Sequence, residues 1–209
     1  MITFEPFPKL ARLSRGCVIT EKLDGTNAQI IIKKLQPTYD RADELYFDIP
    51  TGDHFKLAGD LSVGDLYMVA AGSRTRLIAP GKTTDNYGFA AWVYDNADEL
   101  VKLGEGRHFG EWYGQGIQRT YGLTEKRFAL FDTHKWPEMR PRPACVSVVP
   151  VLHRGEFTSD AITAAMDNLG LFGSTAVPGY MNPEGIVVYH EQAKVSFKKT
   201  FDDKHKEAA

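Results

Sequence analysis

The segment Glu21-Lys22-Leu23-Asp24-Gly25-Thr26-Asn27 constrains this chain more than any other feature, because β-branched residues flank it on both sides. The apolar runs Val18–Thr20 and Gln29–Lys33 predict two strands joined by a tight turn at Asp24-Gly25. Lys22 then ends a strand and points into a site. A lysine amine becomes a nucleophile when it loses its proton. The bland alternative is a solvated surface lysine, and a short motif alone remains a hypothesis.

Two further segments supply groups that suit phosphate and sugar. Arg74 and Arg76 flank a hydroxyl residue directly after the apolar run Leu66–Ala71, and arginines in such a turn can form forked hydrogen bonds to phosphate oxygens. Glu111 lies between small and aromatic residues in the segment 109–118, where it could bond ribose hydroxyls. The alternatives are a basic surface turn and an ordinary turn acid. Asn27 offers an amide to a sugar or a phosphate.

Three later groups complete the set. Phe128 and Phe131 fall on opposite faces of one strand, so one belongs to a core and the other could stack on a base, unless both simply pack. Glu184 stands at the mouth of an apolar strand, where a carboxylate suits a hard divalent cation beside a triphosphate. Lys198 and Lys199 could hold phosphates or belong to a solvated tail. Together these groups suit attack on the α-phosphate of a nucleotide.

Charge and cysteine content narrow the cellular setting. The net charge of −2 means that any nucleic acid would be bound through a local basic patch. Cys17 and Cys145 lie far apart and form no CxxC pair, which disfavours a zinc ribbon or a disulfide scaffold and suits a reducing cytosol. The chain has no signal pattern and no apolar stretch that could span a bilayer. We therefore expect a soluble, cytoplasmic protein that does not bind membranes.

Helical and strand patterns alternate irregularly along the sequence. We expect helices at Phe89–Leu103 and at Thr158–Leu171, the second with a cap at its start and an end at Gly170. Further strands are expected at His108–Glu111, Arg127–Asp132, Glu184–His190 and Lys194–Lys198, and Asp40–Gly64 is left unassigned. There is no regular βαβ rhythm and no GxGxxG. The predicted class is α+β with largely antiparallel sheets, in a single domain of residues 1–209.

In order and spacing, these segments resemble the covalent nucleotidyltransferase superfamily of DNA ligases, RNA ligases and mRNA capping enzymes. EKLDGTN resembles the KxDG lysine motif, and Asn27 stands where the RNA ligase 2 family of ATP-dependent RNA ligases has its asparagine. Ser73-Arg74-Thr75 resembles the arginine motif, and FGEWYGQGIQ followed by FALFD resembles that family's central segment. EGIVVY and VSFKK resemble the metal-acid and terminal lysine motifs. The resemblance runs from Val18 to Lys199.

The resemblance implies an adenylyltransferase (nucleotide-grasp) domain of mainly antiparallel sheets flanked by helices, which uses ATP with Mg²⁺ or Mn²⁺. Lys22 would attack the α-phosphate and form lysyl-AMP; AMP would pass to a 5′-phosphate end, and a 3′-hydroxyl would displace it. Phe131 would take the adenine and Glu184 the metal. The residues that the resemblance assigns to nucleotide binding are Glu21, Asn27, Arg74, Glu111, Phe131, Lys198 and Lys199.

The chain also departs from the family pattern. The terminal lysines Lys198 and Lys199 are adjacent, whereas the family motif reads Lys-x-Lys, so the alignment of Lys199 with the second lysine of the motif is in question. Tyr189 stands where a lysine is expected shortly after the metal-binding glutamate. Arg154 could contact an end phosphate or be a surface arginine. About ten residues follow Lys199, so we expect a minimal adenylation domain without a C-terminal OB-fold or helical domain.

The leading interpretation is an RNA ligase, and a compact one of this kind would not be surprising in a virus. Its partner would be nucleic acid with 5′-phosphate and 3′-hydroxyl ends, with RNA favoured by Asn27 and the 109–118 segment. A minimal DNA ligase and an end-binding module with decayed chemistry are the alternatives. Guanylyl transfer is disfavoured because no OB domain follows.

Overall fold

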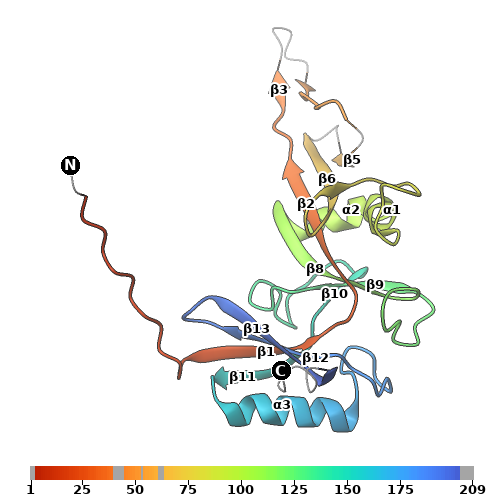
Figure 1. Ribbon diagram of the computed structural model, residues 1–209. Helices are drawn as coiled ribbons and strands as arrows, with labels where there is room; N and C mark the ends of the chain where they lie inside the picture. Colours follow the sequence, from red (N-terminus) through yellow and green to blue (C-terminus); the bar gives the residue numbers. More distant parts are fainter. Residues whose placement is uncertain (1–2, 40–44, 53, 61–63, 203–209) are drawn as a thin grey trace. The chain divides into compact units, whose positions relative to one another are not determined.

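The computed structural model describes residues 3–39, 45–52, 54–60 and 64–202 (Figure 1). The chain divides into two compact units. Unit 1 contains the described parts of Met1–Leu23 and Pro150–Ala209, and unit 2 contains those of Asp24–Val149. The chain therefore leaves unit 1 one residue after Lys22 and returns to it at Pro150.

Unit 1 is built on an antiparallel sheet. Its strands, in sheet order, are β11 (Val151–Glu156), β1 (Gly16–Lys22), β12 (Gly185–His190) and β13 (Val195–Thr200). Strand β1 is central and pairs with β11 on one side and β12 on the other. The first strand of the chain is thus held by two segments from its C-terminal third.

One helix, α3 (Ser159–Phe172), covers one face of this sheet. The buried residues between them are Cys17, Ile19, Ala165, Met166, Leu169, Ile186 and Val188. The Thr158 hydroxyl accepts the N–H of Ala161 at 3.1 Å and caps the helix as the sequence predicts. The helix ends at Phe172, and Gly173 rather than Gly170 is its C-cap: Gly173 has φ of 80°, which favours glycine, and a Cβ there would lie 2.5 Å from the carbonyl oxygen of Tyr180.

Unit 2 contains the larger sheet. In sheet order its strands are β10 (Val146–Val148), β9 (Lys126–Leu130), β8 (Gly106–Gly114), β2 (Thr26–Lys34), β6 (Asp65–Ser73) and β5 (Lys56–Asp60), with β7 (Leu77–Ile78) also paired to β6. Strands β9 and β10 are parallel and the other pairs antiparallel. The short pair β3 (Thr38–Tyr39) and β4 (Leu45–Tyr46) forms a separate ribbon.

Helical segments cover one face of the large sheet. They are α1 (Phe89–Asp95), α2 (Ala97–Leu100) and the 3₁₀ turn η2 (Val101–Leu103). Their apolar side chains pack on alternate residues of the strands, among them Ile30, Val69 and Phe128. The opposite face of β2 and β8 carries Asn27 and Glu111, and it is called the open face below because the helices described in unit 2 pack on the other face.

The predicted helix Phe89–Leu103 is therefore broken into three pieces. The break lies at Asn96, whose side-chain amide and backbone N–H both donate to the carbonyl oxygen of Trp92, at 2.8 and 3.1 Å. Asparagine competes for backbone groups in this way and so interrupts helices. The helix begins where Asp85 accepts the backbone N–H groups of Ala90 and Ala91.

The predicted class is confirmed, because the structure combines few helices with mostly antiparallel sheets. Each predicted strand overlaps an observed one. Strand β9 stops at Leu130 rather than Asp132, because the Asp132 carboxylate accepts the N–H groups of His134 and Lys135 and starts a turn. In the unassigned segment Asp40–Gly64 the structure adds β4 and β5, and residues 40–44, 53 and 61–63 lie outside the described ones. No helix among the described residues is long and apolar enough to cross a membrane.

Candidate functional site

In unit 1, Lys22 contacts the carboxylate predicted to hold a metal. Lys22 is the last residue of β1 and is paired with Gly185, the residue after Glu184. The Lys22 Nζ lies 2.6 Å from Glu184 Oε2, although the two residues are 162 positions apart in the chain. Their side chains are 23% and 15% exposed, so the pair is largely enclosed yet open to a ligand. The sheet thus brings together the predicted nucleophile and the carboxylate predicted to bind a metal ion.

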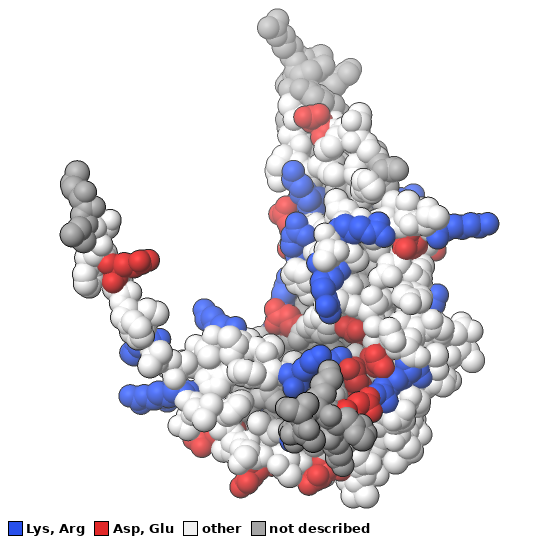
Figure 2. Space-filling view, in the orientation of Figure 1, with Lys and Arg blue, Asp and Glu red and all other residues white. Residues whose placement is uncertain are grey.

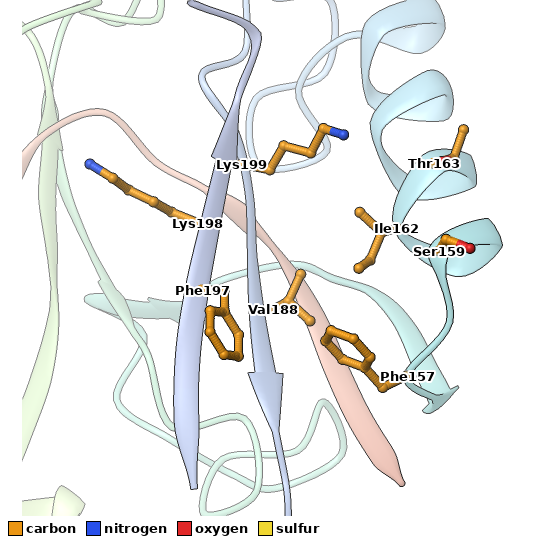
Figure 3. A pocket seen from close by; sticks show the side chains of 8 residues that line it. All are labelled: Phe157, Ser159, Ile162, Thr163, Val188, Phe197, Lys198 and Lys199. Atoms are coloured by element: carbon orange, nitrogen blue, oxygen red, sulfur yellow. The ribbon is translucent and has the colours of Figure 1, made fainter. Parts of the chain in front are cut away.

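The two adjacent lysines of β13 lie on opposite faces of this sheet. Lys198 is paired with Val187, which is paired with Thr20, and this row shares the face of Lys22 because alternate residues share a face. Lys199 is paired with Ile186 on the face that α3 covers. Figure 3 shows the two side chains pointing in opposite directions, with Lys199 toward α3 beside a pocket of about 310 Å³. Of the two adjacent lysines, Lys198 alone shares a sheet face with Lys22.

Arg154 and Tyr189 lie on the same face as Lys22. Both are paired with Val18, Arg154 from β11 and Tyr189 from β12. Since Val18 and Lys22 are four positions apart on one strand, their side chains leave the same side of the sheet. Tyr189 therefore occupies this face where the family pattern has a lysine. The predicted end-phosphate contact of Arg154 stays a prediction.

Glu21 is buried and its carboxylate is fully engaged inside unit 1. Only 1% of the residue is exposed. The carboxylate accepts the Ser174 hydroxyl at 2.5 Å and the backbone N–H groups of Thr175 and Ala176 at 2.8 Å each. Burial raises the pKa of Glu21, and these hydrogen bonds oppose the rise. Here the side chain holds the loop after α3, and its predicted role in nucleotide binding stays a prediction.

In unit 2, Asn27 and Glu111 are direct cross-strand neighbours on the open face. The Glu111 carboxylate also accepts the backbone N–H of Gly25 at 3.1 Å. Gly25 passes so close to β8 that a Cβ there would lie 2.3 Å from the carbonyl oxygen of Trp112. The glycine of the lysine motif is thus required by a close backbone approach, and Glu111 both fixes this turn and stands beside Asn27.

The structure separates the two phenylalanines of the 128–132 segment as the alternation predicts. Phe128 is 1% exposed and belongs to the core beneath the helices. Phe131 is 38% exposed and follows β9, where its N–H donates to the carbonyl oxygen of Phe109. Arg74 is exposed in the turn between β6 and β7, which the Ser73 hydroxyl braces by accepting the N–H groups of Thr75 and Arg76. An exposed aromatic ring and an exposed guanidinium are both available to a ligand.

Sequence reasoning missed the residues that hold Asp24. Arg119 Nε lies 3.0 Å from Asp24 Oδ2, and the Tyr121 hydroxyl accepts the backbone N–H of Asp24 at 2.7 Å. The segment that carries them has positive φ at Gln118, Thr120 and Tyr121, with values of 42°, 56° and 56°. Such conformations are costly for non-glycine residues and are frequent at functional sites. The position of Arg119 directly after GQGIQ was the available signal.

Potential metal ligands form no cluster in the part of the chain that the structure describes. Among the described residues no group of three or more histidine, cysteine, aspartate or glutamate side chains could hold an ion. Mg²⁺ usually takes one or two protein carboxylates and completes its shell with water and substrate phosphates. Glu184, enclosed but not sealed, is suited to be such a single carboxylate.

Comparisons with solved structures agree with this architecture. Structures of mutants of an RNA ligase from Naegleria gruberi are similar: one with AMP and Mn has a TM-score of 0.55 at 18% identity, and one with ATP and Mn has 0.53 at 19%. Each match covers 93% of this chain but 53% of the Naegleria chain, so this chain spans about half the length of those proteins. At this identity the similarity shows the fold.

Sequence comparison gives the family. No curated protein sequence matches the chain at a significant level. A family model described as RNA ligase matches residues 15–201, which include every predicted site residue from Glu21 to Lys199. Because that match covers most of the chain, this protein belongs to the RNA ligase family.

Proposed function

We propose that this protein is an ATP-dependent RNA ligase whose chemistry begins at Lys22. The Lys22 Nζ, as the deprotonated amine, attacks the α-phosphorus of ATP and releases a proton; the bond to the β-phosphate oxygen breaks and pyrophosphate leaves, giving lysyl-AMP. An oxygen of the 5′-phosphate of an RNA end then attacks the phosphorus of lysyl-AMP, and the Nζ–P bond breaks, which transfers AMP to the RNA. A 3′-hydroxyl finally attacks that 5′-phosphate, loses its proton to solvent and releases AMP. The observation that most supports this proposal is the 2.6 Å contact between Lys22 and Glu184, in a chain of the RNA ligase family.

In this proposal the residues of unit 1 serve the reacting phosphate. Glu184 holds the Lys22 ammonium at the end of β1 before nucleotide binds, and it would be the protein ligand of a divalent cation. A bound Mg²⁺ or Mn²⁺ would neutralise triphosphate charge. Lys198, which shares the sheet face of Lys22, would contact the α-phosphate. Arg154 lies on that face too and would contact the terminal phosphate of the RNA.

The residues of unit 2 would recognise the nucleotide. Glu111 would accept ribose hydroxyls and Asn27 would contact phosphate, since the two side chains are cross-strand neighbours. Phe131, exposed on the open face, would stack on adenine, and Arg74 would bind a phosphate from its turn. Asp24 would be held by Arg119 so that the chain directly after Lys22 keeps its course.

The test is covalent labelling with ATP carrying a labelled α-phosphate. Lys22→Ala should remove the label completely, because no other amine takes the place of Nζ at the end of β1. The matched control is Lys194→Gly, which removes a lysine from an exposed turn of unit 1 where φ is 55° and suits glycine. It should label like the parent. Label on a peptide other than the one that contains Lys22 would overturn the assignment.

A further inference from the structure

The open face of the large sheet continues beyond Asn27 and Glu111. Alternation places Gln29 and Lys33 on this face of β2, and Phe109 and Arg107 on this face of β8. Phe109 is directly paired with Gln29 and is 47% exposed, which is unusual for a phenylalanine in the middle of a sheet. A ring and several polar groups therefore follow one another along the strands, outside the residues assigned above.

A hydrogen-bonded network fixes Arg107 over this face. Its guanidinium Nη1 donates to Gln29 Oε1 at 2.8 Å, and Gln29 Nε2 donates to the carbonyl oxygen of Ser73 at 3.1 Å. Gly72, the partner of Gln29 on β6, provides the room, since a Cβ there would lie 2.7 Å from the Gln29 side chain. Residues of β6, β2 and β8 thus hold the side chain of Arg107 in one position over the open face.

These groups match the chemistry of an unpaired nucleotide strand. Single strands are bound by aromatic rings that stack on bases and by cationic groups that track the backbone. Along β8, Glu111, Phe109 and Arg107 follow at intervals of about 7 Å, the spacing of alternate residues on a strand. Figure 2 shows basic side chains over the strands that Figure 1 labels β2, β6 and β8, with acidic ones between them. In a chain of net charge −2, such local basic groups favour a polyanion.

We propose that this part of the open face binds an unpaired segment of the RNA substrate, with a base stacked on Phe109 and a phosphate held by Arg107, which Gln29 positions. Lys33 lies further along the same face and contacts the next part of the backbone. The inference rests on the proposed function for the identity of the strand. It adds a site for the body of the RNA to the residues that act on its end and on ATP.

The experiment measures binding of a labelled 12-nucleotide RNA with blocked ends at several salt concentrations, without ATP. Phe109→Ala should weaken binding by roughly 5- to 100-fold and leave the salt dependence unchanged, because stacking releases no counterions. Arg107→Ala should weaken binding and lower the slope of log K against log salt by about 0.7, the value for one phosphate contact on a single strand. Gln29→Ala should give a weaker form of the Arg107 effect.

The control is Lys102→Ala, which removes one positive charge from η2 on the helix-covered side of the same unit and should bind RNA like the parent. A 12-base-pair duplex should bind without any dependence on Phe109, because its bases are already stacked. Parent-like single-strand binding by Phe109→Ala and Arg107→Ala would overturn the inference.

ATP labelling of the same variants separates this inference from the proposed function. If labelling falls in parallel with RNA binding, the two residues act on the nucleotide and the inference is wrong. If the parent takes up no label but the RNA-binding differences remain, the proposed chemistry fails and the strand site stands.

Discussion

The two units divide their polar residues in different ways. In unit 1 three of the predicted site residues are largely enclosed and in contact with other groups: Lys22 contacts Glu184, and Glu21 binds the loop after α3. In unit 2 the important groups are spread over an open sheet face, where Asn27, Glu111 and Phe131 are available to a ligand. The contrast suggests that changes in unit 1 alter the rate of chemistry at saturating ATP, whereas changes in unit 2 alter the affinity for what is bound.

The contrast between the two units predicts that, after loss of Lys22 itself, loss of Glu184 has the largest effect on the labelling rate. Glu184→Ala should lower the rate of labelling at saturating ATP by about 100-fold or more, because it removes the proposed metal ligand and the partner of Lys22. The measurement is a Mg²⁺ titration of the labelling rate. Glu156→Ala, an exposed acid of β11, serves as the control. An unchanged titration would exclude Glu184 as the metal ligand.

Glu111 tests the other half of the comparison. Glu111→Ala should raise the apparent KM for ATP by roughly 10- to 100-fold, since it removes a charged acceptor, with a smaller loss of maximal rate. Glu111→Gln keeps an oxygen that can accept the Gly25 N–H, so its apparent KM for ATP should lie between those of the parent and of Glu111→Ala. Steady-state labelling against ATP concentration checks this. A loss confined to the maximal rate would contradict the division between the units.

The adjacent lysines of β13 provide a smaller and more local test. Lys198→Ala should slow labelling by about 10-fold, as expected for one charge-assisted phosphate contact. Lys199→Ala should have a lesser effect, because its side chain lies on the α3 face. An equal fall in the labelling rate of the two variants would contradict the prediction that the sheet face decides which lysine contacts the phosphate.

The smallest expected effect concerns stability and comes from Glu21. Burial raises its pKa above the ordinary value of 4.5, so the folded chain holds this proton more tightly than the unfolded chain. The free energy of unfolding should then fall as pH rises from 4.5 through the raised pKa. Glu21→Gln can keep the bonds to Thr175 and Ala176 through its amide oxygen and should lack this fall. The measurement is denaturant unfolding of both proteins at a series of pH values. The same change in the free energy of unfolding with pH in the parent and in Glu21→Gln would contradict the prediction.

Local patterns predicted the strands around Lys22 because alternation and β-branched residues act over a few positions. The adjacency of Lys198 and Lys199 put the register of Lys199 in question, and in the structure the two residues lie on opposite faces of the sheet. Which of them shares the face of Lys22 depends on the pairing of β13 with β12 and of β12 with β1, and registers between distant strands are not written in either segment.

One local side-chain bond and several long-range contacts account for most of what the sequence did not predict. The helix Phe89–Leu103 satisfied the apolar periodicity, but the side chain of Asn96 bonded the preceding turn and broke it. The Asp24–Arg119 pair joins residues far apart in the chain, and only folding brings them together. The family motifs named most of the candidate site, whereas the bonds that hold the motif backbone in place required the structure.

The separation of 162 positions between Lys22 and Glu184 has a consequence for the order in which the parts of the site are made. Chains emerge from the ribosome N-terminus first, and units fold as they become complete. Unit 2 is complete at Val149, while β1 still lacks both of its partner strands. A nascent chain therefore carries the proposed nucleophile, Lys22, from the start without the Glu184 carboxylate beside it. On the proposed function, a chain that ends before residue 184 would contain the residues of unit 2 but could not form lysyl-AMP with the help of Glu184.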